Sequence, residues 1–185
     1  MRRAEAVKLI MQSVRDELVV ACNGMIGREV FTHRDRAANF YMIGSMGLAL
    51  SIGIGVALSR RDKSVLVIDG DGNVLMSAGV LASAAAADLD NLRHIVLDNE
   101  AHGSTGGQRT ITQSVALEKV ARASGYRYAA RVPTADLADA LPGFLKQTGP
   151  AMLLVKVQKD NMPGIGRVSY TPPEIARRFS SSIRA

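Results

Sequence analysis

The chain has 185 residues, a single cysteine and a formal net charge of +6. With 47% hydrophobic and 22% charged residues, it suits one globular domain whose core needs neither disulfides nor a structural metal. The lone cysteine, Cys22, excludes an intramolecular disulfide or a cysteine-ligated cluster built by this chain alone, and we expect it to be a buried hydrophobe. Basic residues form no long run and only 4% of residues are aromatic, so small anions are favoured over nucleic acid as ligands.

Neither a signal peptide nor a membrane-spanning helix is predicted, and we expect a cytoplasmic protein. Glu5, Lys8 and Arg15 interrupt the apolar stretch that a signal peptide would need after its first basic residues. Residues 42–58 are uncharged over 17 positions, but this is shorter than the ~20 residues of a spanning helix, and the segment holds four glycines. It predicts a tight turn followed by a closely packed, buried helix.

Apolar periodicity and turn residues predict alternating helices and strands along the chain. Helices are predicted over residues 4–14, 46–59, 74–87, 115–124, 135–147 and 174–179, the last with prolines at its start. Strands are predicted over residues 18–22, 40–43, 64–68, 94–97 and 152–157. His94 falls within a predicted strand and is expected to be structural.

This alternation predicts a three-layer α/β/α fold with a central, mostly parallel sheet. No repeat or low-complexity linker divides the chain, so residues 1–185 are expected to form a single domain, with 161–185 as a C-terminal tail and helix. In such sheets ligands bind beyond the carboxyl ends of the strands. The residues that follow Ile43, Ile68 and Leu97 are therefore the candidates for a functional site.

These three strand ends carry glycine, carboxylate and amide residues. They read Gly44-Ser45-Met46-Gly47, then Gly70-Asp71-Gly72-Asn73, then Asp98-Asn99-Glu100-Ala101-His102-Gly103. Asp71 is a hard oxygen ligand between two glycines, which let backbone amides approach a phosphate closely. Asn73 is expected to open the next helix, whose N-terminus favours an anion. With Asn99 and a main-chain carbonyl, Asp71 leaves open positions that suit Mg²⁺ shared with phosphate oxygens, so the residues predict a magnesium-diphosphate site.

The same residues resemble a known fingerprint. Gly70-Asp71-Gly72, followed by 26 residues and Asn99, is similar to the motif of thiamine-diphosphate enzymes, which reads GDG, a spacer of this size and NN. Asp98 replaces the first Asn of that pair. A GDG alone is also an ordinary turn, so the spacing carries the resemblance. It implies the C-terminal, diphosphate-binding domain of such an enzyme, with thiamine diphosphate and Mg²⁺ as cofactors.

The resemblance also implies roles for individual residues. Mg²⁺ would bind the side chains of Asp71 and Asn99 and the carbonyl of Ala101. The implied cofactor-binding set is Gly44, Ser45, Met46, Gly70, Asp71, Gly72, Asn73, Asn99, Ala101, His102 and Gly103. Within it, Gly72, Asn73, His102 and Gly103 would contact the diphosphate.

The implied catalytic set is Met46, Gly44 and His102. Met46, 25 residues before Asp71, would lie under the cofactor and force its bent form. The Gly44 carbonyl would accept a hydrogen bond from the 4′-amino group, and His102 would face cofactor or substrate. Plain core packing is the alternative for Met46, and an ordinary loop position is the alternative for His102.

Four segments narrow the resemblance to the decarboxylases of sulfopyruvate and phosphonopyruvate. They read NFYMIGSMG, VIDGDGNVLM, LDNEAHGSTGGQ and, at the tail, RVSYTPPEIARRF. The resemblance implies a β subunit that helps to release CO₂ from a small anionic 2-oxoacid, a 3-sulfo- or 3-phosphonopyruvate. The segment Glu100-Ala101-His102 departs from the family, where a Gly and a Tyr are more common, and this leaves the substrate open.

A partner chain is also implied. The family's catalytic Glu, which contacts N1′ of the cofactor, belongs to a second domain of similar size, for which this chain has no room. Glu5, Glu17 and Glu29 lie in the first helical units of the present domain and are not assigned that role. We therefore expect a separate α subunit that carries the pyrimidine-binding domain and its Glu. Because residues 42–58 and 74–87 are so apolar, we also expect the chain to form homo-oligomers in isolation.

Alternatives remain open at this point. One is an acetolactate-synthase-like carboligase, and another is a non-catalytic cofactor-binding module. The β subunits of 2-oxoacid:ferredoxin oxidoreductases share the fingerprint but commonly bring cluster-binding cysteines, which a lone Cys22 does not match. The basic loop of His33, Arg34 and Arg36 is either solvated or a holder for the substrate's anionic group.

Overall fold

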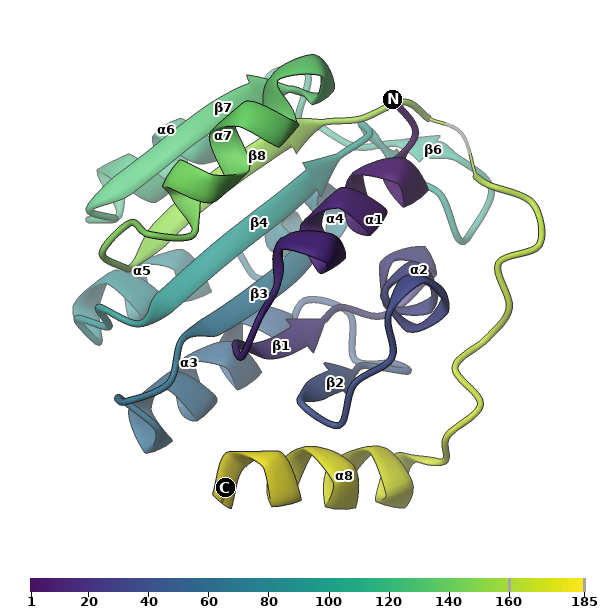
Figure 1. Ribbon diagram of the computed structural model, residues 1–185. Coiled ribbons are helices and arrows are strands. Elements are labelled where there is room, and N and C mark those ends of the chain that lie inside the picture. The colour runs from purple at the N-terminus through teal and green to yellow at the C-terminus, as the bar shows by residue number, and fades with distance from the viewer. Residues whose placement is uncertain (160, 185) are drawn as a thin grey trace.

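The computed structural model describes residues 1–159 and 161–184 and contains a six-stranded parallel sheet with helices on both faces (Figure 1). The strands are β1 (Leu18–Ala21), β2 (Asn39–Tyr41), β3 (Val65–Gly70), β4 (Leu92–Asp98), β7 (Tyr128–Pro133) and β8 (Ala151–Lys156). They lie in the order β2-β1-β3-β4-β8-β7. A separate antiparallel pair joins β5 (Ala101–His102) and β6 (Gln108–Arg109). The predicted three-layer α/β/α fold is confirmed.

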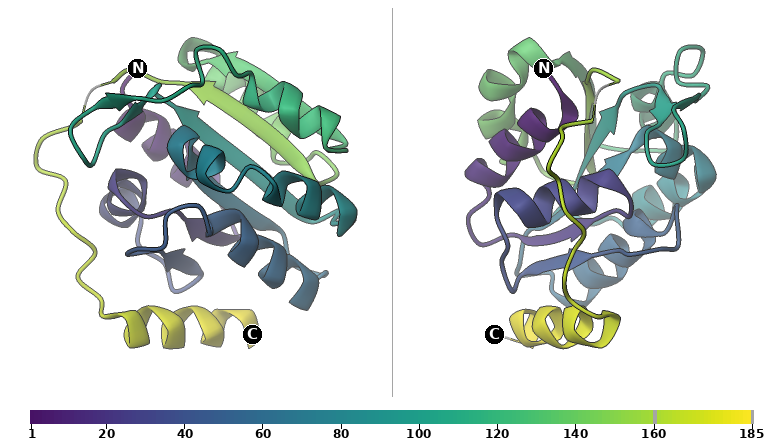
Figure 2. Two further views of the ribbon diagram at one scale, coloured as in Figure 1. Left: turned by 180° about the vertical axis from the view of Figure 1, so that it is seen from behind. Right: turned by 90° about the vertical axis from the view of Figure 1, so that its right-hand side faces the viewer.

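The helices form the two outer layers (Figures 1 and 2). One face is covered by α1 (Arg3–Ser13), α2 (Met25–His33) and α7 (Leu137–Phe144), which follows the short 3₁₀ helix η1 (Thr134–Asp136). The other face is covered by α3 (Ala49–Ser59), α5 (Val80–Ala86) and α6 (Leu117–Ala123). The short helix α4 (Asp71–Met76) follows β3 directly, and α8 (Pro172–Arg184) packs against β2. Among the described residues, no helix combines the length and the apolar character needed to cross a membrane.

The centre of the sheet explains why its strands read as apolar runs. All six residues of β3 are buried because helices cover both faces, which is the pattern expected of a central parallel strand. The connection from β1 to β2 passes through α2 on one face, and the connection from β2 to β3 passes through α3 on the other. The gap between β1 and β3 is therefore the switch point of the topology, where ligands bind in sheets of this kind.

Two of the helical predictions are wrong in part. The helix predicted over residues 46–59 begins at Ala49, because Ser45 and Gly47 adopt left-handed backbone angles with φ of 56° and 92°. Residues 74–87 hold the end of α4 and all of α5 rather than one buried helix, and Met76, the last residue of α4, is 65% exposed. Asn73, expected to open a helix, lies inside α4. The edge strand β7 and the β5–β6 pair were not predicted, since neither has a continuous apolar run.

In the structure, the two arginines of the basic loop after α2 bond the main chain and do not approach the predicted site. Arg34 Nη1 donates to the main-chain carbonyls of Met11 and Val14 at 2.8 and 2.6 Å. Arg36 Nη2 donates to those of Arg15 and Glu17 at 3.0 and 3.1 Å. The two guanidinium groups therefore hold the connection between α1 and β1 at the amino ends of the strands. The predicted site lies at the other end of the sheet, beyond the carboxyl ends of the strands.

A glycine allows α3 to lie close against the sheet. A Cβ atom at Gly53 would be 2.3 Å from Cγ2 of Val67 in β3, far inside van der Waals contact. On the exposed side of the same helix, a Cβ atom at Gly55 would meet nothing within 4 Å. The glycine-rich sequence of α3 thus reflects close helix–sheet packing at Gly53 and no packing constraint at Gly55.

This difference predicts opposite effects of two identical substitutions. Gly53→Ala is expected to lower the free energy of unfolding by about 1–3 kcal/mol, because the added methyl group overpacks the core. Gly55→Ala is expected to raise it by about 0.5–1 kcal/mol, because alanine is the better helix former. Urea unfolding of both variants provides the measurement, and a change of the same sign for both would contradict the packing argument.

The C-terminal helix is fastened to the sheet edge through Asp35. Its carboxylate accepts hydrogen bonds from the Tyr41 and Tyr170 hydroxyls, both at 2.7 Å, and from Arg178 Nη2 at 2.9 Å. Burial alone would raise the pKa of Asp35, but the bonds from Arg178, Tyr170 and Tyr41 outweigh it and lower the pKa below its usual value. The guanidinium of Arg178 also lies 3.9 Å from the ring centre of Tyr170.

Docking of α8 is therefore expected to depend on acidity. A carboxyl group whose pKa is lowered in the folded state stabilises that state above its unfolded pKa, and the contribution is lost as the pH falls through the folded value. NMR signals of Phe179 and Ile175 in α8 should be constant near neutrality and shift toward undocked values below about pH 4. Asp35→Asn should undock α8 at neutral pH, whereas Asp62→Asn, in an exposed pair with Arg60, should not. Unchanged docking in Asp35→Asn would refute this role.

Candidate active site

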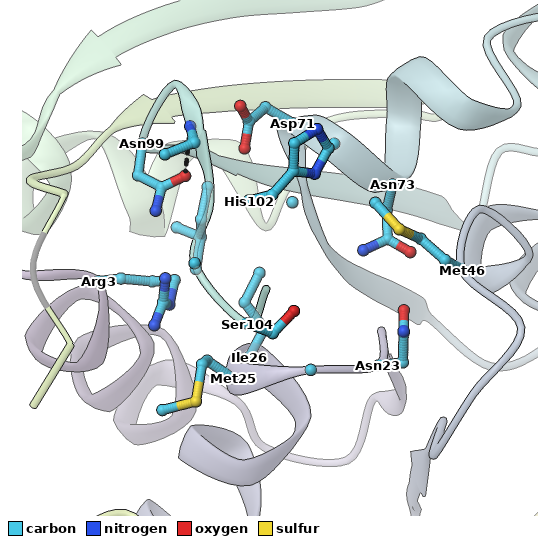
Figure 3. A pocket seen from close by; sticks show the side chains of 16 residues that line it. Arg3, Asn23, Met25, Ile26, Met46, Asp71, Asn73, Asn99, His102 and Ser104 are labelled. Carbon is cyan, nitrogen blue, oxygen red and sulfur yellow. Dashed lines mark hydrogen bonds between the residues drawn. The ribbon is translucent and has the colours of Figure 1, made fainter. Parts of the chain in front are cut away.

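A cavity of about 70 Å³ lies beyond the carboxyl ends of β1, β3 and β4 (Figure 3). Its lining residues are Arg3, Asn23, Gly24, Met25, Ile26, Met46, Gly70, Asp71, Gly72, Asn73, Leu97, Asn99, Ala101, His102, Gly103 and Ser104. Every predicted cofactor-binding residue lines this cavity except Gly44 and Ser45. Those two are exposed and border a neighbouring apolar groove with Ile43 and Leu48.

The Asp71 carboxylate is buried at the start of α4. It is 3% exposed, and its Oδ2 accepts hydrogen bonds from the hydroxyls of Thr110 at 2.5 Å and Thr112 at 3.4 Å. Burial raises the pKa of Asp71, and the negative charge of nearby Asp98 adds to this rise, against the lowering effect of the Thr110 bond. Both of these side-chain donors are neutral hydroxyl groups. Such a carboxylate suits a hard cation as its counter-charge.

The other expected metal ligands come from the turn after β4. In the sheet, Gly70 pairs with Leu97, so Asp71 and Asn99 follow neighbouring, aligned positions. Asn99 is 5% exposed, and its Oδ1 accepts a hydrogen bond from the Ala101 amide at 3.1 Å. An amide oxygen has a second lone pair, so this bond leaves Asn99 able to bind a cation. A carboxylate, an amide oxygen and a main-chain carbonyl are the donor types that Mg²⁺ takes from proteins.

A further observation fits a polar ligand in this cavity. Oδ1 of Asn23, which lines it, is buried and has no hydrogen-bond partner among the described residues. Buried polar atoms in folded proteins are nearly always paired, so an orphan of this kind calls for a bound polar group or water. The donor types in the lining thus fit a diphosphate with magnesium.

Gly72 allows two other predicted residues to meet over the cavity. A Cβ atom at Gly72 would be 2.8 Å from the His102 ring and 3.1 Å from Cε of Met46, so only glycine fits without displacing them. Met46 is half-buried and does not belong to the hydrophobic core of the described residues, which disfavours the core-packing alternative. Asn73 Oδ1 accepts a hydrogen bond from the Gly47 amide at 2.8 Å. Asn73 thereby holds the turn that carries Met46.

Asp98, which replaces the first Asn of the fingerprint, forms a partly buried ion pair with Lys156. The Asp98 side chain is fully buried, and Lys156, its register neighbour in β8, donates to Oδ2 at 2.8 Å. Oδ1 accepts from the Thr112 hydroxyl at 2.8 Å and from the Glu100 amide at 3.0 Å. Lys156 also bonds Glu100 Oε1 at 2.6 Å. These bonds tie the turn after β4 to the threonines that contact Asp71.

A double-mutant cycle tests this pairing. Lys156→Met is expected to lower the free energy of unfolding by about 2–3 kcal/mol, because it leaves the buried Asp98 carboxylate without its cation. Adding Asp98→Asn should recover most of that loss, because an amide needs no counter-charge and still accepts the Thr112 bond. Thermal or urea unfolding of both variants gives the values, with the exposed Lys119→Met as control. Additive losses in the double variant would rule the pairing out.

Several residues of the site, either lining the cavity or bonded to Asp71, were not predicted from the sequence. Asn23, Met25 and Ile26 directly follow β1, so the strand-end argument applied to β3 and β4 would have found them had it been applied to Cys22. Thr110 and Thr112 return to Asp71 only because the β5–β6 pair folds the chain back, and a two-residue strand leaves no sequence pattern. Arg3 comes from the other end of the sequence, and no spacing rule connects it to this site.

Comparison with known proteins agrees with the fold and the cavity. Residues 20–155 match the family described as thiamine pyrophosphate enzyme, C-terminal TPP binding domain, where thiamine pyrophosphate is another name for thiamine diphosphate. The chain therefore belongs to the thiamine-diphosphate-dependent enzymes and corresponds to their C-terminal cofactor-binding domain. The family expected from the GDG fingerprint is confirmed.

Individual relatives within this family include decarboxylases of two related 2-oxoacids. The chain is 44% identical over 183 residues to a phosphonopyruvate decarboxylase of Streptomyces viridochromogenes. This match covers 98% of the present chain but only 46% of that protein. It is 39% identical over 182 residues to a sulfopyruvate decarboxylase subunit beta of Methanococcus maripaludis, which spans 98% of this chain and 97% of that subunit. The chain thus spans about half the length of the phosphonopyruvate decarboxylases and nearly all of that subunit.

Solved structures support the fold alone. Benzoylformate decarboxylase from Polynucleobacter necessarius superimposes with a TM-score of 0.69 at 19% identity, over 88% of this chain and 34% of that one. A thiamin diphosphate-dependent enzyme from Mycobacterium smegmatis gives 0.68 at 22% identity, over 85% and 32%. Both are much longer chains, of which this protein matches about one third.

Proposed function

We propose that this chain is the diphosphate- and magnesium-binding β subunit of a thiamine-diphosphate-dependent decarboxylase that acts on a 3-sulfo- or 3-phosphonopyruvate. One observation carries the proposal: the cavity at the switch point of the sheet collects Asp71, Asn99 and Ala101 together with Gly72 and His102. The match to a sulfopyruvate decarboxylase subunit beta over nearly the whole chain supports the reaction. Residues 1–185 would act as a single cofactor-binding domain, with 161–185 as its tail.

The chain's own residues would hold and shape the cofactor. Asp71, Asn99 and the Ala101 carbonyl would hold Mg²⁺, with the backbone around Gly72 facing the diphosphate. Met46 stands beside Gly72 on the cavity wall, where it would support the bent form of the cofactor. When bound, thiamine diphosphate supplies the electron sink for loss of CO₂ from a 2-oxoacid. The His102 ring would then lie against the bound group and help to orient it.

A second chain would complete the site. The name of the Methanococcus relative, subunit beta, implies at least one further subunit in that enzyme. In the present chain three large apolar side chains near the cavity are exposed: Ile43 by 58%, Leu48 by 45% and Met76 by 65%. Exposed apolar groups of this size suit a protein interface. We propose that they face an α subunit with the pyrimidine-binding domain and its Glu, and that copies of this chain associate through them in its absence.

The central experiment is reconstitution. The purified chain is expected to lack decarboxylase activity by itself, because the acid that activates the aminopyrimidine would be supplied by the proposed α subunit, and general acid–base help is worth about 10²–10⁴-fold. Co-expression with a subunit that carries the pyrimidine-binding domain should restore CO₂ release from sulfopyruvate or phosphonopyruvate. Asp71→Ala should abolish the restored activity, whereas Asp139→Ala, at an exposed position of α7, should leave it intact.

The same assay separates the alternatives. An acetolactate-synthase-like carboligase has weaker support, since the Escherichia coli acetolactate synthase isozyme 1 large subunit is 26% identical over 77% of this chain. Such an activity would join two pyruvates through a new carbon–carbon bond, with loss of one CO₂. A non-catalytic module would bind thiamine diphosphate and Mg²⁺ with no turnover in the presence of any partner. Steady turnover by this chain alone, free of partner by mass spectrometry, would refute the split-site proposal.

A further inference from the structure

Arg3 is a buried cation at the wall of the cofactor cavity. It is 4% exposed, although it belongs to the first turn of α1, and its guanidinium lines the cavity with Asp71 and Asn99 (Figure 3). Among the described lining residues, Arg3 and Asp71 are the only Arg, Lys, Asp or Glu side chains. The cavity therefore pairs one buried cation with one buried carboxylate, at separate positions on its wall.

The orientation of Arg3 is fixed from behind. Nε and Nη2 donate to the two carboxylate oxygens of Glu29 in α2 at 2.9 Å each, and the Glu29 side chain is fully buried. Nη2 also donates to Oδ1 of Asn161 at 2.7 Å, and Asn161 donates in turn to the Gly103 carbonyl at 3.1 Å. This fork leaves Nη1 on the side toward the cavity, and a Cβ atom at Gly103 would lie only 3.3 Å from it.

Stability alone does not account for this pair. Removing two charges from water costs more than their attraction commonly returns, and buried ion pairs can often be replaced by apolar side chains without loss. Glu29 engages one edge of the guanidinium and leaves the Nη1 edge directed at Gly103. An arginine held in this way is prearranged to bind a second oxyanion through charge-assisted hydrogen bonds.

We propose that Arg3 is a ligand of the cofactor's diphosphate, positioned by Glu29. This inference rests on the proposed cofactor role of the cavity and adds a residue to it. With Asp71 holding the metal ion on one side, Arg3 would neutralise the diphosphate oxygens that face away from the metal. Glu29 sets the direction of the guanidinium, and Asn161 links it to Gly103, so the first helix, α2 and the C-terminal tail all meet at the diphosphate.

Calorimetric titration with thiamine diphosphate in the presence of Mg²⁺ tests the proposal. The double variant Arg3→Gln/Glu29→Gln removes both charges and keeps two amides that can bond each other, so no lone buried charge remains. It is expected to weaken binding roughly 10- to 100-fold, the range for loss of a charge-assisted hydrogen bond. Magnesium pyrophosphate should lose affinity by a similar factor. Lys8→Met, which removes an exposed charge from the same helix, should bind as the parent chain does.

The outcomes separate this inference from the proposed function. No binding of thiamine diphosphate by the parent chain would overturn both. Binding by the parent chain and equal binding by the double variant would overturn only the role of Arg3. A raised KM for the 2-oxoacid in the reconstituted enzyme with unchanged cofactor affinity would assign Arg3 to the substrate's anion and would also overturn it. If the double variant does not fold, Arg3→Lys keeps a cation without the fork and is expected to weaken binding about tenfold, with unchanged binding counting against the proposal.

Discussion

The parallel register of β3 on β4 is the constraint on which the candidate site depends. Gly70 pairs with Leu97, and these residues come one position before Asp71 and two positions before Asn99. The chain therefore leaves both strands at the same end of the sheet. A slip of one residue would turn every side chain of β3 to the opposite face and would carry Asp71 away from Asn99. The register is held by the apolar side chains of both strands, buried on both faces. The core thus sets the geometry of the cavity.

Aligned strand ends place buried acidic groups close together, and the surrounding residues compensate for this. Burying the carboxylates of Asp98 and Asp71 costs desolvation energy. Lys156 forms an ion pair with Asp98. Threonine hydroxyls donate hydrogen bonds to both carboxylates. The side-chain donors to Asp71 among the described residues are the neutral hydroxyls of Thr110 and Thr112, in keeping with a carboxylate that can take a cation. The distinction matters because a carboxylate already paired with lysine would gain little from a metal ion. The chain therefore separates a structural carboxylate from one available to a ligand.

Sequence reasoning could reach the parts of the site that sit on strand ends. The apolar runs of β3 and β4 and the GDG turn locate Asp71 and Asn99, because parallel strands present their carboxyl ends together. Features that depend on tertiary contacts could not be predicted in this way. Nothing local shows that Arg34 and Arg36 bond main-chain carbonyls at the far edge, or that the Ala- and Leu-rich segment after Asn73 breaks into α4 and α5. Periodicity reports burial and secondary structure, but it does not report which distant groups a long side chain meets.

Arg3 illustrates this limit most clearly, and it also changes how the positive charge of the chain is understood. A formal charge of +6 suggests affinity for anions, but the charge itself is spread over the surface and says little about a site. In the fold, Arg34 and Arg36 bond the main chain and Lys156 bonds Asp98. Arg3 is the one Arg or Lys side chain among the described residues that line the cavity. The placement of a basic group at the cavity is therefore a matter of the burial and orientation of one arginine beside glycine-rich turns, and net charge says little about it.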